Sequence, residues 1–348
     1  MKTLGVVLVT VSLILSVLIG LTVAARRGGA AGEAVRQRAV IGLSMDTLKE
    51  ARWQRDRDLF AKRAGELGAE VMVLSANSDD IRQAQDVQSL IASGVDAIVI
   101  VPHDGRAMAK SVQDAKAAGI PVIAYDRLIT DCELDLYITF DNVRVGELQA
   151  RYLVDHLPTP GKGRIVRLYG SPTDNNAKLF KQGQDNVLGP LIERGDIQVV
   201  HEDWVMNWEP QNAKKIMNAA INKVGDAFDA VLASNDGTAG GAIQSLLEEG
   251  LAGKKLVTGQ DADQVACQRL VAGTQTMTVY KPITHLATRA AELAVSLARR
   301  EVIIARDALD NGRGQVPAVF LDVIALDKGN LDTVIQDGFH TREEVYGK

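Results

Sequence analysis

The chain has 348 residues, of which 46% are hydrophobic and 24% are charged, and its formal net charge is −5 at pH 7. This length predicts two lobes, and the composition excludes a disordered chain. The acidic balance argues against nucleic-acid binding, because a basic patch usually marks such sites.

Cys132 and Cys267 match no metal-binding spacing. A disulfide could join them outside the cytoplasm, but free, partly buried thiols are the better interpretation.

The amino-terminal stretch predicts export. Lys2 precedes an apolar run over residues 4–25, which is typical of a signal peptide and is also long enough for an uncleaved membrane anchor. Arg26 and Arg27 follow the run and argue against simple export, because such charges tend to hold their side in the cytoplasm. We assign residues 1–38 to a signal peptide or membrane anchor plus a tether, and we expect an exported protein, periplasmic or extracytoplasmic, that is freely soluble or membrane-tethered.

From residue 39 onward, short apolar runs alternate with amphipathic helical patterns. In the first half, strands are predicted at 39–45, 70–76, 96–102 and 120–125, and helices at 52–68 and 81–92. Buried strands that alternate with helices predict a parallel sheet covered on both faces. Residues 135–142 are interpreted as a segment that crosses to a second half, because the pattern restarts after them.

The second half repeats this build. Its predicted helices cover 145–157 and 238–250 and begin at 175 and 210, and its predicted strands cover 164–170, 197–205, 230–236 and 255–261. An extended segment at 276–282, a helix from Ile283 to about Arg299 and one more extended segment at 318–327 follow. The fold class is therefore α/β, with two Rossmann-like lobes, parallel sheets and a cleft between them.

Polar and aromatic side chains gather where the predicted strands end. Asp126 and Arg127 follow one buried strand directly, and an internal ion pair would be the simpler interpretation if they stood alone. Ligands, however, bind beyond the carboxyl ends of parallel strands, and other strands end in the same way. The remaining candidates are Arg52, Trp53, Asp174, Asn175, Asn176, Trp204 to Trp208, Asn235, Asp236, Gln260, Asp261 and Lys281. Such a mixture of amides, ions and indoles suits a sugar, whose hydroxyls donate and accept and whose C–H faces are apolar.

Several candidates also have a purely structural interpretation. Either Asn235 or Asp236 is expected to cap the following helix, and Asp174 could form a turn and cap. Trp53 could pack in the core, and we expect only one of Trp204 and Trp208 to contact a ligand. The common position at strand ends nevertheless favours one shared cleft.

Enzyme motifs were sought in the same sequence. It contains no G-x-S-x-G elbow, Walker P-loop, H-E-x-x-H or early G-x-G-x-x-G. The glycines of "NDGTAGGA" predict close helix packing instead. Asp126 and Asp261 could serve as acid and base if they met as in sugar-cleaving enzymes, but we expect no catalytic residue, no cofactor and no metal.

Eight segments carry a family resemblance. They are "RWQRDRDLF", "IAYDRLI", "FDNVRVGELQA", "GSPTDNNAKLFKQGQ", "ASNDGTAGGAIQ", "GQDAD", "AGTQTMTVYKPI" and "VIQDGFH". In order and spacing they resemble the ribose/galactose-type sugar-binding proteins, the periplasmic components of ABC transporters, and within that family the members that bind D-xylose. The likeness runs from about residue 39 to residue 340, although "SMDTLKEA" before the first helix has no close match.

The resemblance implies the type I periplasmic binding protein fold, in which three hinge segments join two lobes that close around one pyranose. The amino-terminal lobe would comprise residues 39–140 and 281–321, and the carboxyl-terminal lobe residues 141–280 and 322–348. The resemblance also implies hydrogen-bonding roles for Arg52, Asp126, Arg127, Asn176, Asn235, Asp261 and Lys281, with Asp174 as a further candidate. Trp53 and Trp208 would sandwich the sugar from opposite lobes.

The implied partners are D-xylose and the membrane permease of an ABC transporter, with the protein acting as a monomer. Alternatives left open by the sequence are another monosaccharide such as glucose, ribose or arabinose, a chemoreceptor as the docking partner, and a sugar-processing enzyme. A transcriptional regulator of the same build would carry an amino-terminal helix-turn-helix, and here the apolar run occupies that place.

Overall fold

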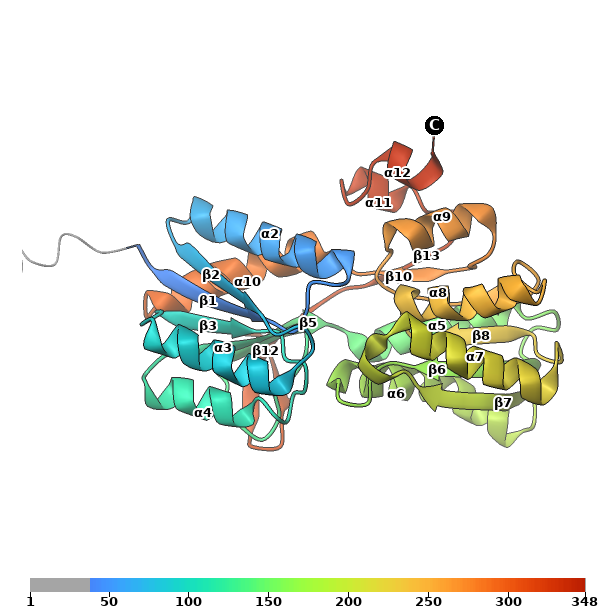
Figure 1. The fold of residues 1–348 in the computed structure, drawn as a ribbon, viewed down its shortest axis with the longest axis horizontal. Helices are drawn as coiled ribbons and strands as arrows, with labels where there is room; N and C mark the ends of the chain where they lie inside the picture. The colour runs from blue at the N-terminus through green and yellow to red at the C-terminus, as the bar shows by residue number, and fades with distance from the viewer. Residues whose placement is uncertain (1–37, 348) are drawn as a thin grey trace, which may run out of the picture. The chain divides into compact units, whose positions relative to one another are not determined.

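Two parallel sheets organise the chain in the computed structural model, which describes residues 38–347 (Figure 1). The larger sheet has seven strands in the order β11-β12-β5-β4-β3-β1-β2, and only the β11–β12 pair is antiparallel. These strands are β1 (Val40–Met45), β2 (Glu70–Ser75), β3 (Ala97–Ile100), β4 (Val122–Tyr125), β5 (Leu136–Phe140), β11 (Asp307–Asp310) and β12 (Gln315–Leu321).

Helices cover both faces of the larger sheet. They are α2 (Ala51–Glu66), α3 (Asp80–Ala92), α4 (Ala109–Ala117) and α10 (Ile283–Ala298). Helices α2 and α10 pack together on one face, and α3 and α4 pack together on the other (Figure 1). Every residue of β3, β4 and β5 is buried, as a parallel sheet covered on both sides requires.

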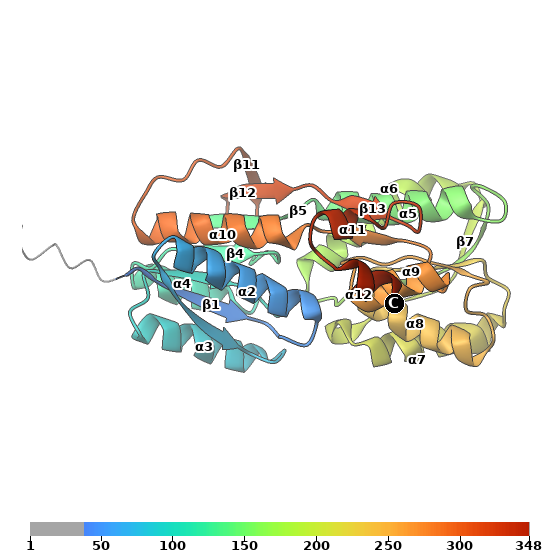
Figure 2. The same ribbon diagram turned by 90° about the horizontal axis from the view of Figure 1, so that it is seen from above.

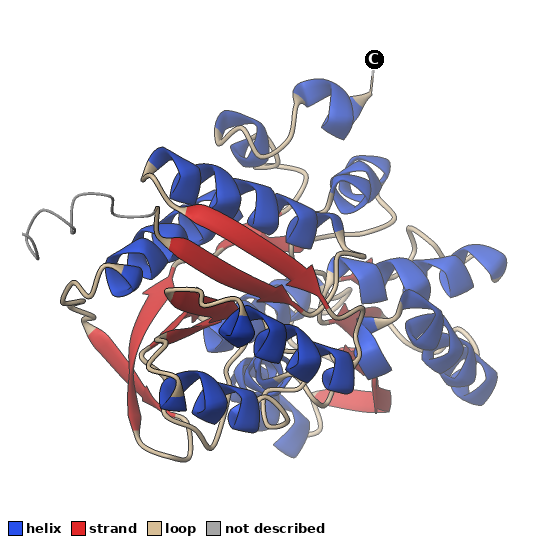
Figure 3. Cartoon of the chain, turned by 60° about the vertical axis from the view of Figure 1, so that its left-hand side comes forward, coloured by secondary structure: helices blue, strands red, loops and turns tan. Residues whose placement is uncertain are grey.

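The smaller sheet has four parallel strands in the order β7-β6-β8-β9. They are β6 (Gly163–Tyr169), β7 (Ile197–Trp204), β8 (Ala230–Ala233) and β9 (Leu256–Val257). Alternate strand residues enter two separate cores. Ile165 and Leu232 pack with residues of α5 (Asn142–His156) and α6 (Asn175–Glu193). Val166 and Val231 pack with residues of α7 (Pro210–Val224) and α8 (Asp236–Glu248). Figure 3 shows the resulting layers of strands and helices.

The chain passes between the two sheets three times. It leaves the larger sheet after β5, returns between β10 (Thr278–Tyr280) and α10, and leaves again between β12 and β13 (Ile324–Leu326). Strands β10 and β13 form an antiparallel pair. A short helix η2 (Met206–Trp208) precedes α7, and α9 (Gln264–Ala272) follows β9. After α11 (Thr333–Gln336), the last helix α12 (Arg342–Tyr346) packs against α9 (Figure 2).

The predicted α/β fold class with parallel sheets is confirmed, and two segments differ from prediction. Residues 135–142, predicted as a crossing segment, contain β5, a buried strand between β4 and β12. Residues 318–327, predicted as one extended segment, contribute to β12 and β13, which belong to different sheets. Both differences arise because an apolar run predicts a strand but does not identify its neighbours. The proposed lobe boundaries stay a prediction.

Three further expectations concern the ends and the cysteines. The export segment falls on residues outside the described range. Within residues 38–347, no helix combines the length and the apolar character that crossing a membrane requires. Cys132 and Cys267 are free thiols and both are buried. Burial raises the pKa of each thiol to about 12, so both stay protonated at neutral pH.

Candidate functional site

All ten predicted site residues line one cavity. The empty space between these residues, part of which is open to solvent, is about 350 Å³. Arg52 and Trp53 come from the first turn of α2, whereas Asp126 and Lys281 directly follow β4 and β10. The cavity is therefore built where strands end and helices begin, from elements associated with both sheets.

Arg52 is the central cation of the cavity. Its buried guanidinium donates to Asp126 Oδ2 at 2.8 Å, Asp261 Oδ1 at 3.3 Å and Asp56 Oδ2 at 3.3 Å. Lys281 Nζ lies 3.1 Å from Asp261 Oδ1 and 4.0 Å from Asp126 Oδ2. Two cations and two lining carboxylates thus form one network.

The charge state of Asp126 follows from this network. Burial opposes ionisation of its carboxyl group, but the opposing attraction of Arg52 and then Lys281 prevails and lowers its pKa to about 2. Asp126 is therefore an ionised hydrogen-bond acceptor at neutral pH and has no proton to donate as a general acid.

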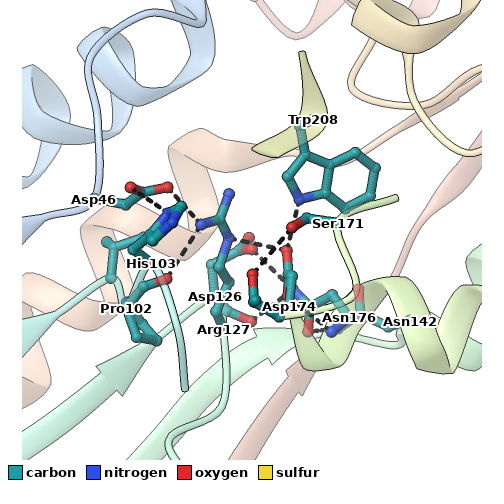
Figure 4. Close-up of polar contacts among 12 residues, drawn as sticks. Asp46, Pro102, His103, Asp126, Arg127, Asn142, Ser171, Asp174, Asn176 and Trp208 are labelled. Carbon is teal, nitrogen blue, oxygen red and sulfur yellow. Dashed lines mark hydrogen bonds and ion pairs between the residues drawn. The ribbon is translucent and has the colours of Figure 1, made fainter. Parts of the chain in front are cut away.

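Arg127 is the second guanidinium of the cavity and is held by two carboxylates (Figure 4). Its Nη1 donates to Asp46 Oδ2 at 2.7 Å and to the Pro102 carbonyl at 3.1 Å. Its Nε lies 3.0 Å from Asp174 Oδ2. Behind it, His103 Nδ1 lies 3.0 Å from the other oxygen of Asp46. These contacts fix the direction in which the guanidinium points.

Other groups of the protein already contact both carboxylate oxygens of Asp174. Oδ1 accepts from the Asn176 amide at 2.9 Å, and Oδ2 accepts from Trp208 Nε1 at 3.1 Å as well as meeting Arg127. Burial raises its pKa, against the attraction of Arg127. As the N-cap of α6, Asp174 orients three other lining residues (Figure 4).

Asn176 connects the start of α6 to the end of β4. Its Nδ2 donates to the main-chain oxygen and to Oδ1 of Asp126, each at 3.0 Å. Its own Oδ1 accepts from Asn142 Nδ2 at 2.9 Å. The arrangement holds Asp126 in a left-handed backbone conformation, with φ of 61°.

Backbone strain is concentrated at the cavity. Besides Asp126, Trp208 has φ of 56° and Asp261 has φ of 98°. Positive φ is costly for residues other than glycine, above all for a bulky one such as tryptophan, and it persists only where surrounding contacts enforce it. Such strain clusters at functional sites, so its position agrees with that of the cavity.

The two cavity tryptophans are almost fully buried. The guanidinium carbons of Arg52 and Arg127 lie 4.0 Å and 5.2 Å from the ring centroid of Trp53. Trp208 packs against Phe180, with ring centroids 6.3 Å apart. It also covers Gly170, where a Cβ atom would lie 1.9 Å from the indole. The structure brings both indoles to the cavity, and their sandwich arrangement around a sugar stays a prediction.

Three further residues line the cavity besides the ten with predicted binding roles: Glu50, Phe180 and Gln260. Gln260 is 2% exposed, and its Oε1 is buried with no hydrogen-bond partner in the described part of the chain. The same is true of Glu50 Oε2. Gln260 was among the candidates at the predicted strand ends. Phe180 could have been predicted because it lies four residues after Asn176 and therefore on the same helix face. No sequence pattern of either kind indicated Glu50.

Other strand-end residues belong to the scaffold. Asn235 caps α8, because its Oδ1 accepts from the Thr238 amide at 2.9 Å, so that predicted alternative is confirmed while the residue still lines the cavity. Asp236 is buried and accepts from Gln275 Nε2 at 2.7 Å. Trp204 is not among the residues that line the cavity, and its ring packs on Tyr169 with centroids 4.9 Å apart.

Comparisons with known proteins agree with this geometry. A family model described as "Periplasmic binding protein domain" matches residues 41–301. The chain is 51% identical to the D-xylose-binding periplasmic protein of Haemophilus influenzae, over 88% of this chain and 92% of that protein. It is 50% identical to the protein of the same name from Escherichia coli, with the same coverages.

A solved structure shares the fold. It is a carbohydrate transporter solute-binding protein from Chloroflexus aurantiacus in complex with D-glucose, which superposes with a TM-score of 0.82 at 32% identity. The match covers 88% of this chain and 98% of that one. The predicted type I fold is thereby confirmed.

Proposed function

The chain belongs to the periplasmic binding protein family, and we propose that it captures D-xylose in its cavity and delivers it to the permease of an ABC transporter. The main support for this proposal is the composition of the cavity lining. Ten predicted polar and indole side chains meet around one cavity of about 350 Å³. The names of the two D-xylose-binding relatives support the choice of sugar.

The charges of the lining suit a polyhydroxylated, uncharged ligand. Arg52, Arg127 and Lys281 offer donors, and Asp126 and Asp261 offer acceptors. Each of these three cations already lies in an ion pair with a carboxylate of the lining, and an ionic ligand would disturb that balance of charge. Sugar hydroxyls instead donate to the carboxylates and accept from the cations without changing that balance.

The proposed mechanism is closure around the sugar. Arg52 and Asp126 come from elements of the larger sheet, whereas Asp261 follows β9 of the smaller sheet. A ligand that contacts both groups gains its full binding energy only when the two halves are together, and this difference shifts the equilibrium towards the closed form. The closed form then docks on the permease, with a chemoreceptor as the alternative partner.

The proposal assigns no chemical step to the protein. Asp126 is ionised, and both it and Asp261 lie in ion pairs with Arg52. A pair of sugar-cleaving carboxylates needs one acid that holds its proton near neutral pH. Proton NMR of D-xylose incubated with the protein should therefore show the sugar unchanged, and the appearance of a product would contradict the proposal.

Tryptophan fluorescence tests ligand capture. D-xylose should change the emission in a saturable manner, because Trp53 and Trp208 line the cavity. Trp53→Phe and Trp208→Phe should each reduce that change, whereas Trp204→Phe should retain it, because Trp204 lies outside the cavity lining. An unchanged spectrum at millimolar D-xylose would overturn the proposed function.

A further inference from the structure

The segment over residues 337–340 contacts the immediate neighbours of two cavity residues. His340 Nε2 lies 2.7 Å from the carbonyl oxygen of Ala262, next to Asp261. The Phe339 ring lies 5.0 Å, centroid to centroid, from Tyr280, next to Lys281. Phe339 and His340 are 5% and 7% exposed, so the segment is packed into the protein although it lies close to the end of the chain.

The same segment receives a side chain from the other half of the molecule. Arg55, one helical turn after Arg52 on α2, donates from Nη1 to the carbonyl oxygen of Phe339. Its guanidinium carbon lies 4.6 Å from the centroid of the Phe339 ring. Helix α2 packs on α10 and β2 of the larger sheet, whereas the segment leads into α12, which packs on α9 (Figure 2). The Arg55–Phe339 contact therefore joins the two halves.

We propose that residues 337–340 act as a closure latch, in which Phe339 captures Arg55 when the cleft closes and His340 holds the backbone that presents Asp261. This inference rests on the proposed sugar-binding function and extends it to residues that do not line the cavity. Neither Phe339 nor His340 touches the ligand in this account. His340 is a positioning residue, and Arg55 and Phe339 stabilise the closed state.

The backbone beside His340 explains why support is needed. Asp261 and Ala262 are consecutive residues with φ of 98° and 52°. Three hydrogen bonds hold Ala262: its amide donates to Thr278 Oγ1 at 3.2 Å, and its carbonyl accepts from His340 Nε2 at 2.7 Å and from Cys267 Sγ at 3.5 Å. Because a carbonyl oxygen only accepts, Nε2 must carry the proton, and Nδ1 is buried without a hydrogen-bond partner within residues 38–347. The His340 bond is the shorter of the two that the Ala262 carbonyl accepts, and its loss would release one of three restraints on the strained loop.

The Arg55 contact should act on closure and not on folding of either half. A charge-assisted hydrogen bond combined with a cation–π contact is strong when it is partly buried. It is made only when α2 and the segment are together, so it contributes to sugar affinity through the closed state alone. Its removal should speed dissociation of the sugar.

Two pairs of variants in the full-length chain test the latch. Arg55→Met removes the charge and the donors, and Arg342→Met is its matched control, because the Arg342 guanidinium lies 4.9 Å over Tyr346 within α12. Arg55→Met should raise the Kd for D-xylose about tenfold, mainly through a faster off-rate, and Arg342→Met should leave it within twofold. Equal effects of the two variants, or none, would overturn the proposal.

His340→Leu and His340→Gln form the second pair. A glutamine Nε2 can donate to the Ala262 carbonyl in place of the imidazole, whereas leucine cannot. His340→Leu should raise the Kd several-fold, and His340→Gln should recover most of the loss while the urea midpoints of both variants stay similar. If glutamine bound as poorly as leucine, the positioning role would be wrong.

A distance measurement separates the latch from the choice of sugar. Spin labels at Gln85→Cys on α3 and Asn218→Cys on α7 report the separation of the two halves, because both positions are exposed and the native thiols are buried. Arg55→Met should shift the distances of the sugar-free protein towards longer values. This shift is expected even if D-xylose produces no heat with the parent, an outcome that would overturn the proposed ligand alone. Unchanged distances in Arg55→Met would overturn the latch.

Discussion

Gln260 and Asn235 lie past the ends of neighbouring strands, yet the protein engages their side chains in opposite ways. Asn235 and Thr238 form a reciprocal capping box at the start of α8. Gln260 is buried, and its Oε1 has no hydrogen-bond partner among the described residues. Asn235 therefore serves both the scaffold and the cavity, whereas Gln260 can be satisfied only by something inside the cavity.

Replacement of Gln260 should separate binding from stability. Gln260→Leu removes a buried side-chain oxygen that has no partner among residues 38–347, so the free energy of unfolding of the sugar-free protein should stay the same or rise. Sugar binding should weaken by about 1–3 kcal/mol, because a ligand hydroxyl loses its partner. Urea unfolding and calorimetric titration measure the two effects, and a variant that binds as tightly as the parent would exclude Gln260 from the site.

Asn235→Ala should change both quantities. Loss of an N-cap side chain costs about 1 kcal/mol of stability, and loss of the amide at the cavity should weaken D-xylose binding by about 1–3 kcal/mol. Asn218→Ala, on an exposed face of α7, provides the control for the chemical change. A loss of stability with unaltered affinity would leave Asn235 as a helix cap only.

The sequence predicted which residues meet but not how each is used. The strand-end argument gave a wider set of candidates, because carboxyl ends of parallel strands share an edge, and the family resemblance reduced that set to the ten residues. The sequence did not indicate that the Asp174 carboxylate pairs with Arg127 and accepts hydrogen bonds from Trp208 and from the Asn176 amide. Glu50 was missed because its contribution depends on how the first loop folds, which apolar spacing does not encode.

At the scale of elements, two helices approach unusually closely beneath the cavity. A Cβ atom on Gly183 of α6 would lie 1.9 Å from the Val143 carbonyl, and one on Gly146 of α5 would lie 2.0 Å from the Phe180 carbonyl. Helix α6 also carries Asn176 and Phe180, which line the cavity. The α5–α6 contact therefore sets the position of part of the site.

Two glycines of α6 provide a matched comparison. Gly183→Ala should destabilise the protein by at least about 1–3 kcal/mol, because the methyl group collides with backbone, and should weaken sugar binding by displacing α6. Gly189→Ala meets nothing within 4 Å on the same helix and should be neutral or stabilise by roughly 0.5–1 kcal/mol. Thermal unfolding would contradict this account if the two variants behaved alike.

Close helix packing was predicted only in part. The glycines of "NDGTAGGA" predicted it, and this is confirmed, because a Cβ on Gly241 of α8 would lie 2.1 Å from the Pro210 carbonyl at the start of α7. Gly146 and Gly183 carried no such prediction, because single glycines in helical patterns do not reveal their partners. Likewise, β9 has only two residues where seven were predicted, because β9 pairs along one edge only.

At the scale of the whole molecule, buried charge should govern the response to pH. Burial opposed by cations leaves the pKa of Asp126 and of Asp46 at about 2. Burial raises the pKa of Asp56 to about 6 and that of Asp236 to about 7. The first pair favours ionised carboxylates in the folded state, and the second pair favours protonated ones.

The stability of the sugar-free protein should therefore have a maximum on the acid side of neutrality. Asp126 and Asp46 contribute stability above the unfolded value of 3.8, and it is lost as pH falls towards 2. Asp56 and Asp236 bind protons more readily in the folded state, so stability falls as pH rises from about 4 through 7. Urea midpoints between pH 2 and pH 8 measure the curve, and a steady rise up to pH 7 would contradict this assignment.

Isothermal titration of the purified protein with D-xylose measures directly whether the cavity binds this sugar. We expect saturable one-to-one binding, tighter than for D-glucose, L-arabinose or D-ribose titrated in parallel, because D-xylose is the proposed ligand and the two relatives of about 50% identity are named for binding it. Tighter binding of another of these sugars would retain the cavity and replace the ligand. Absence of heat with all four at millimolar concentration would contradict the claim that this cavity binds a monosaccharide of this class.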